Sequence, residues 1–342
     1  MTLVWIGAVV LAVVIAMYFL TRPAAKPLAA KPPAVRRVEP AQATVEASSV
    51  SASDPPAAPP AEAPVLPMPP LLADFRLLRA EDLTDEQKQV YAARFRNIPR
   101  PPKLLDHLLS SNFVKAASSA QLVELIAGEP LIAGRVLMVT NSPMYALQTP
   151  VSSIGQAVTY LGLNKVRGLC LQYILIDSFK ADSPERKRAL DAVWTASALA
   201  SELTQQLGQR LDFEDRGSLV SAVVLSFIGR LATTASVSRD QLATLSAAPG
   251  LLARTIAEQA TLGLGATQIG RLLMNDWGLP ATIVDDAAAI DAVLYTPSTD
   301  FDAERGNRLA LCYLCARLGE RLAEGELKDL SHFDASVETS PE

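Results

Sequence analysis

The chain has 342 residues, of which 49% are hydrophobic and 20% are charged, so it has room for one large or two small globular domains. Lysine and arginine number 31 against 36 aspartate and glutamate residues, which gives a formal net charge of -5. This mildly acidic balance argues against a general nucleic-acid-binding protein, which needs a basic surface. The three cysteines have no disulfide-framework spacing, which indicates a reducing compartment.

Residues 3–20 are an uncharged apolar segment. At about 1.5 Å per residue, this segment crosses most of a hydrocarbon core of about 30 Å. A cleaved signal peptide is the alternative, but no lysine or arginine precedes the segment, whereas several follow it. The positive-inside rule then places the N-terminus outside and the rest of the chain in the cytoplasm. We therefore expect residues 1–21 to be a retained, single-pass anchor in the inner (cytoplasmic) membrane.

Residues 22–72 are expected to be a disordered, Pro/Ala-rich linker. Residues 21–72 hold 13 of the chain's 24 prolines, many alanines and almost no aromatic residues. Such a segment cannot bury enough apolar surface to offset the entropy lost on ordering. The linker would tether the following domain to the membrane without pressing it against the bilayer.

The rest of the chain is predicted to be all-helical, because apolar residues recur at helical spacing and no stretch alternates with period two. A capping box at Thr84 predicts a helix that ends near residue 96 and has Val90 on its inner side. The predicted division is a lead-in helix segment at 73–89, a main helical domain at 90–295, a C-terminal helix at 296–327 and a disordered tail at 328–342. Further helices are predicted at 103–109, 120–127, 130–140, 154–161, 165–178, 184–207 (closed by Gly208), from Asp212 or Asp215 through an apolar interior at 219–231, and at 239–245, 252–262, 266–276, 281–294 and 301–324.

The centre of the domain is predicted to hold tightly joined helices. Residues 130–140 repeat large apolar side chains at helical spacing, which predicts a buried helix, and the small Gly134 would let another helix approach closely. We expect Asn141 to end this helix, since asparagine tolerates the left-handed conformation. A capping box at Ser153 starts the next helix, and Asn164 is expected to cap the third.

Short motifs spread over residues 90–295 form a recognisable set. They are Ile98-Pro99-Arg100-Pro101-Pro102, Glu129-Pro130-Leu131, Val136-Leu137-Met138-Val139-Thr140-Asn141-Ser142-Pro143-Met144-Tyr145, Ile154, Gln156-Ala157-Val158, Leu161-Gly162-Leu163, Ile228-Gly229-Arg230 and Trp277-Gly278-Leu279-Pro280. In this order and spacing they resemble the HDOD family, bacterial signalling output domains related to the HD metal-dependent phosphohydrolases. The resemblance implies an all-α, multi-helix, HD-like bundle, here preceded by one transmembrane helix and the linker.

The resemblance also bears on catalysis. HD-type phosphohydrolases bind divalent metal through His, adjacent His-Asp and Asp ligands, which generate a hydroxide nucleophile. The two histidines of this chain, His107 and His332, are not followed by Asp. By resemblance, the ligand positions fall at Ala196, Ser226, Phe227 and Ala266, none of which is His or Asp. The resemblance therefore implies a protein that is not an enzyme and that has no metal or other cofactor.

Cys312 and Cys315 form a C-x-x-C pair inside a predicted helix. A structural zinc site needs about four ligands, and no second Cys or His pair lies nearby in the sequence. We interpret the two cysteines as small buried side chains.

Three functional hypotheses remain. The first is a membrane-anchored, non-enzymatic signalling module that binds a protein partner, with the turn at Asn141, Ser142 and Tyr145 as the candidate partner-binding surface. The structural alternative is that Asn141 and Ser142 satisfy backbone groups at a helix junction.

The second hypothesis is a sensor that binds a nucleotide second messenger in the degenerate HD pocket. It requires a basic cavity, for which the candidates are Arg135, Lys165, Arg167, Arg230 and Arg271. The third, DNA binding by the helices around residues 131–161, is disfavoured because they lack suitably spaced Arg and Lys, so no nucleic-acid partner is expected.

Overall fold

The computed structural model describes residue 72 and residues 75–145, 147–297, 300–331 and 333. Within this part of the chain the regular secondary structure is helical, with no strand, so the predicted all-α class is confirmed. The predicted membrane helix at 3–20, the linker and nearly all of the predicted tail lie outside the described residues. With η marking 3-10 helices, the elements are η1 (Ala80–Asp82), α3 (Asp85–Phe95), α4 (Leu104–Leu109), α5 (Ser111–Ala116), α6 (Ser119–Ala127), α7 (Pro130–Thr140), η2 (Pro143–Tyr145), α8 (Ile154–Leu161), α9 (Leu163–Ile176), α10 (Pro184–Arg210), α11 (Arg216–Ser226), α12 (Ile228–Ser236), α13 (Arg239–Ser246), α14 (Gly250–Leu262), α15 (Ala266–Asp276), α16 (Ala281–Ala289), η3 (Asp291–Leu294) and α17 (Ala303–Glu324).

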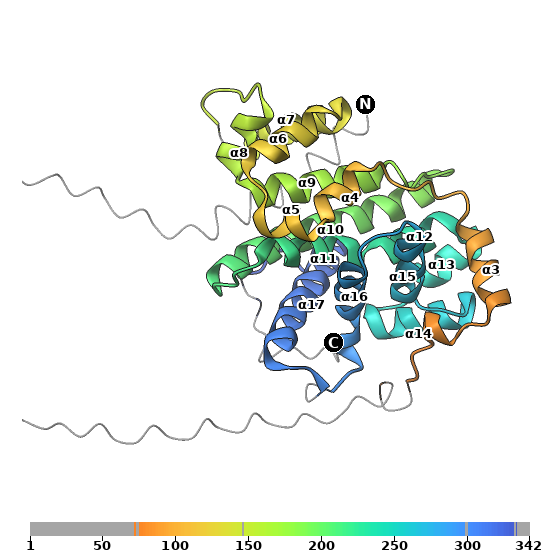
Figure 1. The fold of residues 1–342 in the computed structure, drawn as a ribbon. Coiled ribbons are helices and arrows are strands. Elements are labelled where there is room, and N and C mark those ends of the chain that lie inside the picture. The colour runs from red at the N-terminus through yellow and green to blue at the C-terminus, as the bar shows by residue number, and fades with distance from the viewer. Residues whose placement is uncertain (1–71, 73–74, 146, 298–299, 332, 334–342) are drawn as a thin grey trace, which may run out of the picture.

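The long helix α10 crosses the middle of the molecule, and the other helices are arranged around it (Figure 1). It packs against α17, α11, α12 and α9. At one end, α6, α7 and α8 pack on one another and on α9, while α3, α13 and α14 lie at the right of the view. The core is therefore formed mainly between α10 and the C-terminal helices.

A close approach of α17 to α10 fixes this core. A Cβ added at Gly319 would lie 2.5 Å from the carbonyl oxygen of Ala196 and 3.0 Å from Cβ of Ala200. Only glycine fits at this crossing. Ala196 is consequently buried in a helix contact, at 1% exposure.

The chain enters the domain across α14 and α15. The backbone N–H of Leu78 donates to Oε1 of Gln259 at 2.8 Å, and that of Ala80 donates to Oε1 of Gln268 at 3.1 Å. The side-chain amide of Gln259 donates back to the carbonyl of Arg76 at 3.1 Å. The segment that follows the predicted linker is thus fastened to two C-terminal helices.

The predicted capping box at Thr84 is confirmed, but the predicted inner face of its helix is wrong at one position. Val90 is 61% exposed, whereas Tyr91 and Phe95 are buried. The hydroxyl of Tyr91 donates to the carbonyl of Leu262 at 2.6 Å, and this bond turns the aromatic face of α3 inward.

Helix α7 has the predicted bounds but is not a buried helix. Ile132, Val136 and Thr140 face the core, whereas Leu131 and Met138 are 76% and 68% exposed. The helix lies at the periphery of the molecule, so one of its apolar faces meets solvent. No atom lies within 4 Å of a Cβ added at Gly134, on the same helix.

Three predicted helix ends differ in mechanism from the expectation. Asn141 ends α7 with φ of -83° rather than in the left-handed region, and its side chain instead bonds the backbone of Val151. Asn164 makes no side-chain cap, because α9 begins directly after Gly162. Gly208 does not close α10, which continues to Arg210 because the buried Gly208 packs against Arg216.

The predicted apolar helix after Asp215 is divided into α11 and α12 at Phe227. Among the described residues, the stretch Arg216–Ser236 alone is long and apolar enough to cross a membrane by length and composition. However, 78% of its apolar window is buried within the protein, which is typical of a core helix.

A glycine pair lets α12 and α15 cross at close range. A Cβ added at Gly229 would overlap the carbonyl group of Ala266, and one added at Gly270 would lie 2.9 Å from the backbone nitrogen of Gly229. We predict that Gly229→Ala lowers the unfolding free energy by about 3 kcal/mol or more, because the obstacle is backbone and cannot rotate away. Urea denaturation measures this loss.

The matched control is Gly134→Ala, in an exposed part of α7 with open space around the new methyl group. This variant is expected to gain about 0.5–1 kcal/mol, since alanine is the better helix former. Equal effects of the two substitutions would contradict the proposed crossing.

Candidate functional site

A small cavity lies where the C-terminal helices meet. Its volume is about 10 Å³, which is roughly the space of one water molecule. It lies between the junction of α11 and α12, the start of α15, and side chains of α14, η3 and α17. The lining residues are Ser226, Phe227, Arg230, Leu251, Arg254, Glu258, Ala266, Thr267, Asp291, Arg317 and Glu320.

Three of the four positions predicted to have lost metal ligands line this cavity. They are Ser226, Phe227 and Ala266. Ser226 donates to the carbonyl of Val223 at 2.8 Å, so its hydroxyl is used within its own helix. The fourth position, Ala196, does not line the cavity, because it faces Gly319 in the crossing of α10 and α17.

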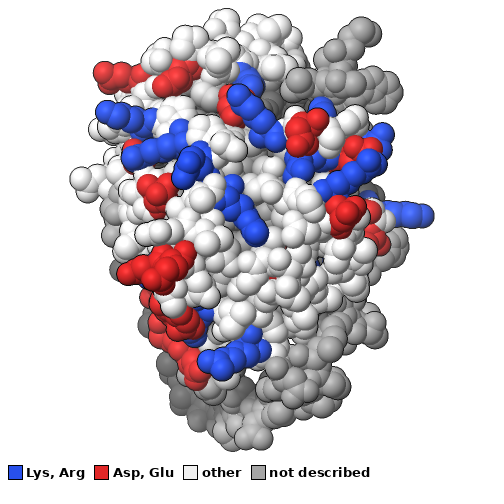
Figure 2. Space-filling model, turned by 90° about the vertical axis from the view of Figure 1, so that its right-hand side faces the viewer, with Lys and Arg blue, Asp and Glu red and all other residues white. Residues whose placement is uncertain are grey.

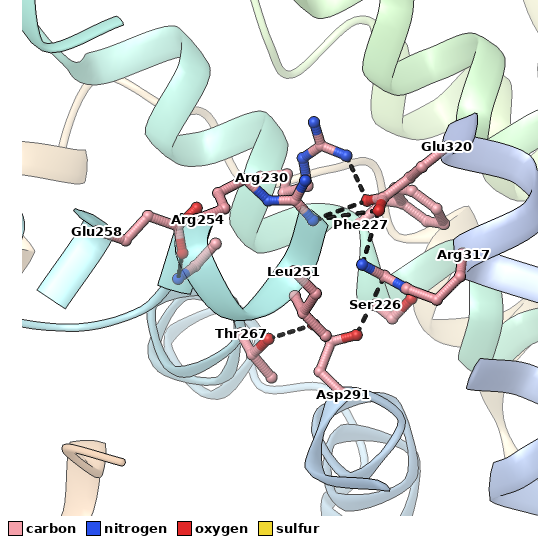
Figure 3. Close-up of a pocket in the computed structure, with 11 residues that line it drawn as sticks. Ser226, Phe227, Arg230, Leu251, Arg254, Glu258, Thr267, Asp291, Arg317 and Glu320 are labelled. Carbon is pink, nitrogen blue, oxygen red and sulfur yellow. Dashed lines mark hydrogen bonds and ion pairs between the residues drawn. The ribbon is translucent and has the colours of Figure 1, made fainter. Parts of the chain in front are cut away.

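The cavity is filled by a network of ion pairs centred on Glu320, here called the Glu320 network (Figure 3). Arg254 donates to both carboxylate oxygens of Glu320 at 3.1 Å, and Arg317 donates to Oε2 at 2.6 Å. Arg230 also donates to Oε1. Three guanidinium groups from α12, α14 and α17 thus converge on one carboxylate.

Two further carboxylates complete the network. Asp291 pairs with Arg317 at 3.3 Å and accepts a hydrogen bond from the hydroxyl of Thr267 at 2.5 Å. Glu258 accepts from the backbone N–H of Ala266 at 2.6 Å, at the start of α15, where a negative charge suits the helix dipole. The lining residues therefore carry three positive and three negative formal charges.

Burial and neighbouring charge set the pKa values of these groups. Burial alone would raise the pKa of Glu320, but Arg230, Arg254 and Arg317 hold it well below its ordinary value. Burial raises the pKa of Glu258, and Arg254 and the Ala266 N–H oppose that shift only in part. Glu320 is consequently a firmly ionised centre, whereas Glu258 is the carboxyl of the network that more readily takes a proton.

The residues at this cavity do not fit a divalent metal. Among the described residues, no group of three or more His, Cys, Asp and Glu side chains is placed to hold one. Guanidinium groups have no lone pair to donate and repel a cation. The three arginines therefore occupy the space in which the HD resemblance would put metal ions.

The candidate partner-binding turn lies elsewhere, after α7. The side-chain amide of Asn141 donates to the carbonyl of Val151 at 2.8 Å and its oxygen accepts from the Val151 N–H at 2.6 Å. The ammonium of Lys165 lies 4.9 Å from the ring centre of Tyr145 and pairs with Glu202 at 2.9 Å. Burial raises the pKa of Tyr145, although Lys165 opposes the shift. Asn141 and Tyr145 thus hold the turn to the domain.

Ser142 is part of the same turn. Its hydroxyl is buried and has no hydrogen-bond partner among the described residues. The three predicted residues are therefore adjacent, but their side chains do not converge on a common cavity.

The basic residues proposed for a nucleotide site are not gathered either. Arg230 lines the filled cavity, whereas Arg271 borders a separate surface groove of about 330 Å³ and pairs with Asp285 at 2.6 Å. Arg135 pairs with Asp177 at 3.0 Å. A nucleotide would have to displace the Glu320 network to enter the degenerate pocket.

The two paired cysteines are buried thiols. Burial raises the pKa of Cys315 to about 11 and raises that of Cys312 further. Because the thiolate is the reactive form, neither is suited to redox or metal chemistry at neutral pH. His107 is on α4, away from the cavity lining, and His332 lies outside the described residues.

Most of the charged residues of the network were not predicted as site residues. Arg254 and Glu258 are four positions apart on α14, and Arg317 and Glu320 are three apart on α17, each pair on a buried face. Charged pairs at helical spacing within an apolar stripe could have signalled a buried ion pair. Asp291, in the short helix η3, carries no comparable signal.

The geometry can be set beside known proteins. A sequence model of the HDOD domain matches residues 98–293, more than half of the chain. The chain belongs to the HDOD family. The recognition made from the short motifs is therefore confirmed.

Solved structures share the fold of this HDOD protein. An HDOD domain protein of unknown function from Geobacter sulfurreducens is 17% identical with a TM-score of 0.54, over 69% of this chain and 78% of that one. A candidate phosphohydrolase from Shewanella amazonensis SB2B is 20% identical with a TM-score of 0.49, over 68% and 81% of the two chains. A candidate signal transduction protein from Marinobacter aquaeolei VT8 is 20% identical with a TM-score of 0.48, over 76% and 58%. No curated protein matches the chain.

We predict that Glu320→Gln destabilises this HDOD protein by about 3–5 kcal/mol, because it leaves three buried guanidinium groups without their common counter-charge. The control is Glu324→Gln, since Glu324 is 40% exposed and touches Arg230 at 3.5 Å. Its effect should stay below about 1 kcal/mol. Chemical denaturation at pH 7 compares the two, and similar losses would contradict the importance of the network.

The same variant carries a pH signature. The pKa of Glu320 is depressed in the folded state, so its stabilisation is present above the unfolded value of about 4.3 and is lost as the pH falls below it. Glu258, with its raised pKa, acts in the opposite sense. Between pH 5 and the acid limit, the wild type should lose its stability advantage over Glu320→Gln, and a constant advantage would contradict the assignment.

Proposed function

We propose that this HDOD protein is a non-enzymatic signalling or regulatory module that binds a protein partner and is tethered to the inner membrane. The observation that carries the proposal is the filled cavity. Its volume of about 10 Å³ compares with about 300–1,000 Å³ for small-molecule sites. A phosphoester substrate would find neither room nor a metal-bound hydroxide there.

Exposed apolar side chains support partner binding. Leu131 and Met138 of α7 are 76% and 68% exposed, and Tyr160 of the neighbouring α8 is 60% exposed. Exposed apolar patches on adjacent elements mark interaction surfaces more often than chance. We name Leu131, Met138 and Tyr160 the α7–α8 surface, which adjoins the turn of Asn141 and Ser142.

A protein partner is favoured over nucleic acid. On the face toward which α3, α13 and α14 lie, Lys and Arg side chains are interspersed with Asp and Glu (Figure 2). Non-specific binding to a phosphate backbone needs a continuous basic surface. The mixed charge of this face and the net charge of -5 support a protein as the partner.

The sequence supplies the tether. The apolar residues 3–20 are proposed to hold the chain in the inner membrane, with the domain in the cytoplasm, and residues 22–72 to act as a flexible linker. Tethering raises the effective concentration of a recruited partner near the membrane without any new contact. The proposed mechanism is therefore localisation of a partner.

The purified full chain is predicted to contain far less than one equivalent of manganese, iron or nickel and to leave bis-p-nitrophenyl phosphate intact. The reason is that the arginines repel a cation from the cavity. Elemental analysis after incubation with each metal, followed by an absorbance assay, measures both properties. Stoichiometric metal together with turnover would overturn the non-enzymatic proposal.

Charge placed on the α7–α8 surface is predicted to remove partner binding. We expect cross-linking in native membranes to yield a specific partner with the wild type, and at least tenfold less with Leu131→Glu/Met138→Glu. Val90→Glu is the control, because Val90 is equally open at 61% exposure but lies on α3. Equal capture by all three proteins would contradict the assignment of the surface.

A further inference from the structure

Arg167 of α9 is a buried cation without a hydrogen-bond partner. Its side chain has 0% exposure, and none of its three guanidinium nitrogens has a hydrogen-bond acceptor among the described residues. Burying a guanidinium without an acceptor is strongly unfavourable. The Glu320 network does not explain Arg167, because Arg167 is not among the residues that line that cavity.

The guanidinium lies against the first turn of α11. A Cβ added at Gly217 would overlap Nη2 of Arg167 and lie 2.8 Å from Oδ1 of Asn164. Gly217 thus leaves room for both side chains beside the start of the helix. The first backbone N–H groups of a helix have no partner within the helix, and the dipole makes this end attractive to anions.

Two further arginines reach the same helix end. Arg216 is the first residue of α11, and its Nε also has no partner among the described residues. Arg308 of α17 donates to the hydroxyl of Ser218 at 3.2 Å. Three helices therefore bring positive charge to one N-terminus.

The nearby carboxylate does not satisfy Arg167. Asp215 caps α11 by accepting from the N–H of Ser218 at 3.1 Å. Burial lowers the pKa of Arg167 to about 10, and the charge of Asp215 offsets this only in part. The donors of Arg167 and the N–H groups of Arg216 and Gly217 remain available to another acceptor.

We propose that the N-terminal end of α11 binds an oxyanion, a phosphate or carboxylate group of a small ligand, through Arg167, the Asn164 side-chain amide and the first-turn N–H groups. Bidentate pairing with an oxyanion would satisfy the buried guanidinium. The site is distinct from the filled cavity, because the eleven residues of α11 separate the two by about 16 Å. The domain would thus respond to a small anion as well as to a protein partner.

The test is thermal unfolding of the full chain in detergent with increasing inorganic phosphate, against sodium chloride at matched ionic strength. The expected result is a saturable rise in Tm of about 5 °C for the wild type. Arg167→Met should abolish the rise and should itself raise Tm without phosphate, since it removes a buried unpaired charge. An arginine that serves only packing would instead leave the variant less stable.

Two controls sharpen the result. Arg188→Met removes an exposed arginine from α10 and should retain the full response. Asn164→Ala, a milder change in the same site, should weaken the response if Arg167→Met does not fold. Parallel titrations with acetate and adenosine monophosphate identify whether the ligand group is a carboxylate, a free phosphate or a nucleotide. Absence of a saturable response to all three anions, or an equal response of the wild type and the Arg167 and Asn164 variants, would overturn the proposal.

Discussion

The buried carboxylate of Glu320 is the constraint on which the C-terminal half of the domain depends. It accepts hydrogen bonds from arginines of α12, α14 and α17, so three helices that are distant in sequence share one counter-charge. In a low-dielectric interior, these groups are stable only as a complete set. Asp291 and Glu258 extend the set to η3 and to the start of α15.

This arrangement accounts for how an HD-like fold persists with a cavity that does not fit metal ions. A divalent cation would bridge helices through its ligands, and here the Glu320 network forms the bridge instead. The chain entering from the linker is fastened to Gln259 and Gln268, on α14 and α15. The attachment of the tether and the ion-pair network therefore lie on the same pair of helices.

The sequence predicted the helical class and several helix bounds, because apolar periodicity and capping residues act locally. Residues 130–140 and 266–276 were placed correctly for this reason. The burial of α7 was misjudged because Leu131 and Met138 are apolar in sequence yet face solvent, which only the packing of the whole domain decides. Helix α5 was not predicted, since its six residues carry too short a pattern.

The candidate site was predicted in outline only. Motif spacing brought Ser226, Phe227 and Ala266 to one cavity but misplaced Ala196, whose surroundings depend on Gly319 more than a hundred residues later. The prediction of apolar or tiny side chains there missed the charges, because Arg254, Glu258, Arg317 and Glu320 come from helices outside the motifs. Long-range pairing of charges leaves little trace in a single sequence.

The most direct test of the central claim is a double-mutant cycle between Arg254 and Glu320, measured as unfolding free energies of the wild type, Arg254→Met, Glu320→Gln and the double variant. If the network carries the core, the double variant should be more stable than the sum of the single losses by about 2 kcal/mol. A coupling energy near zero would show that the two side chains act independently and would contradict the account.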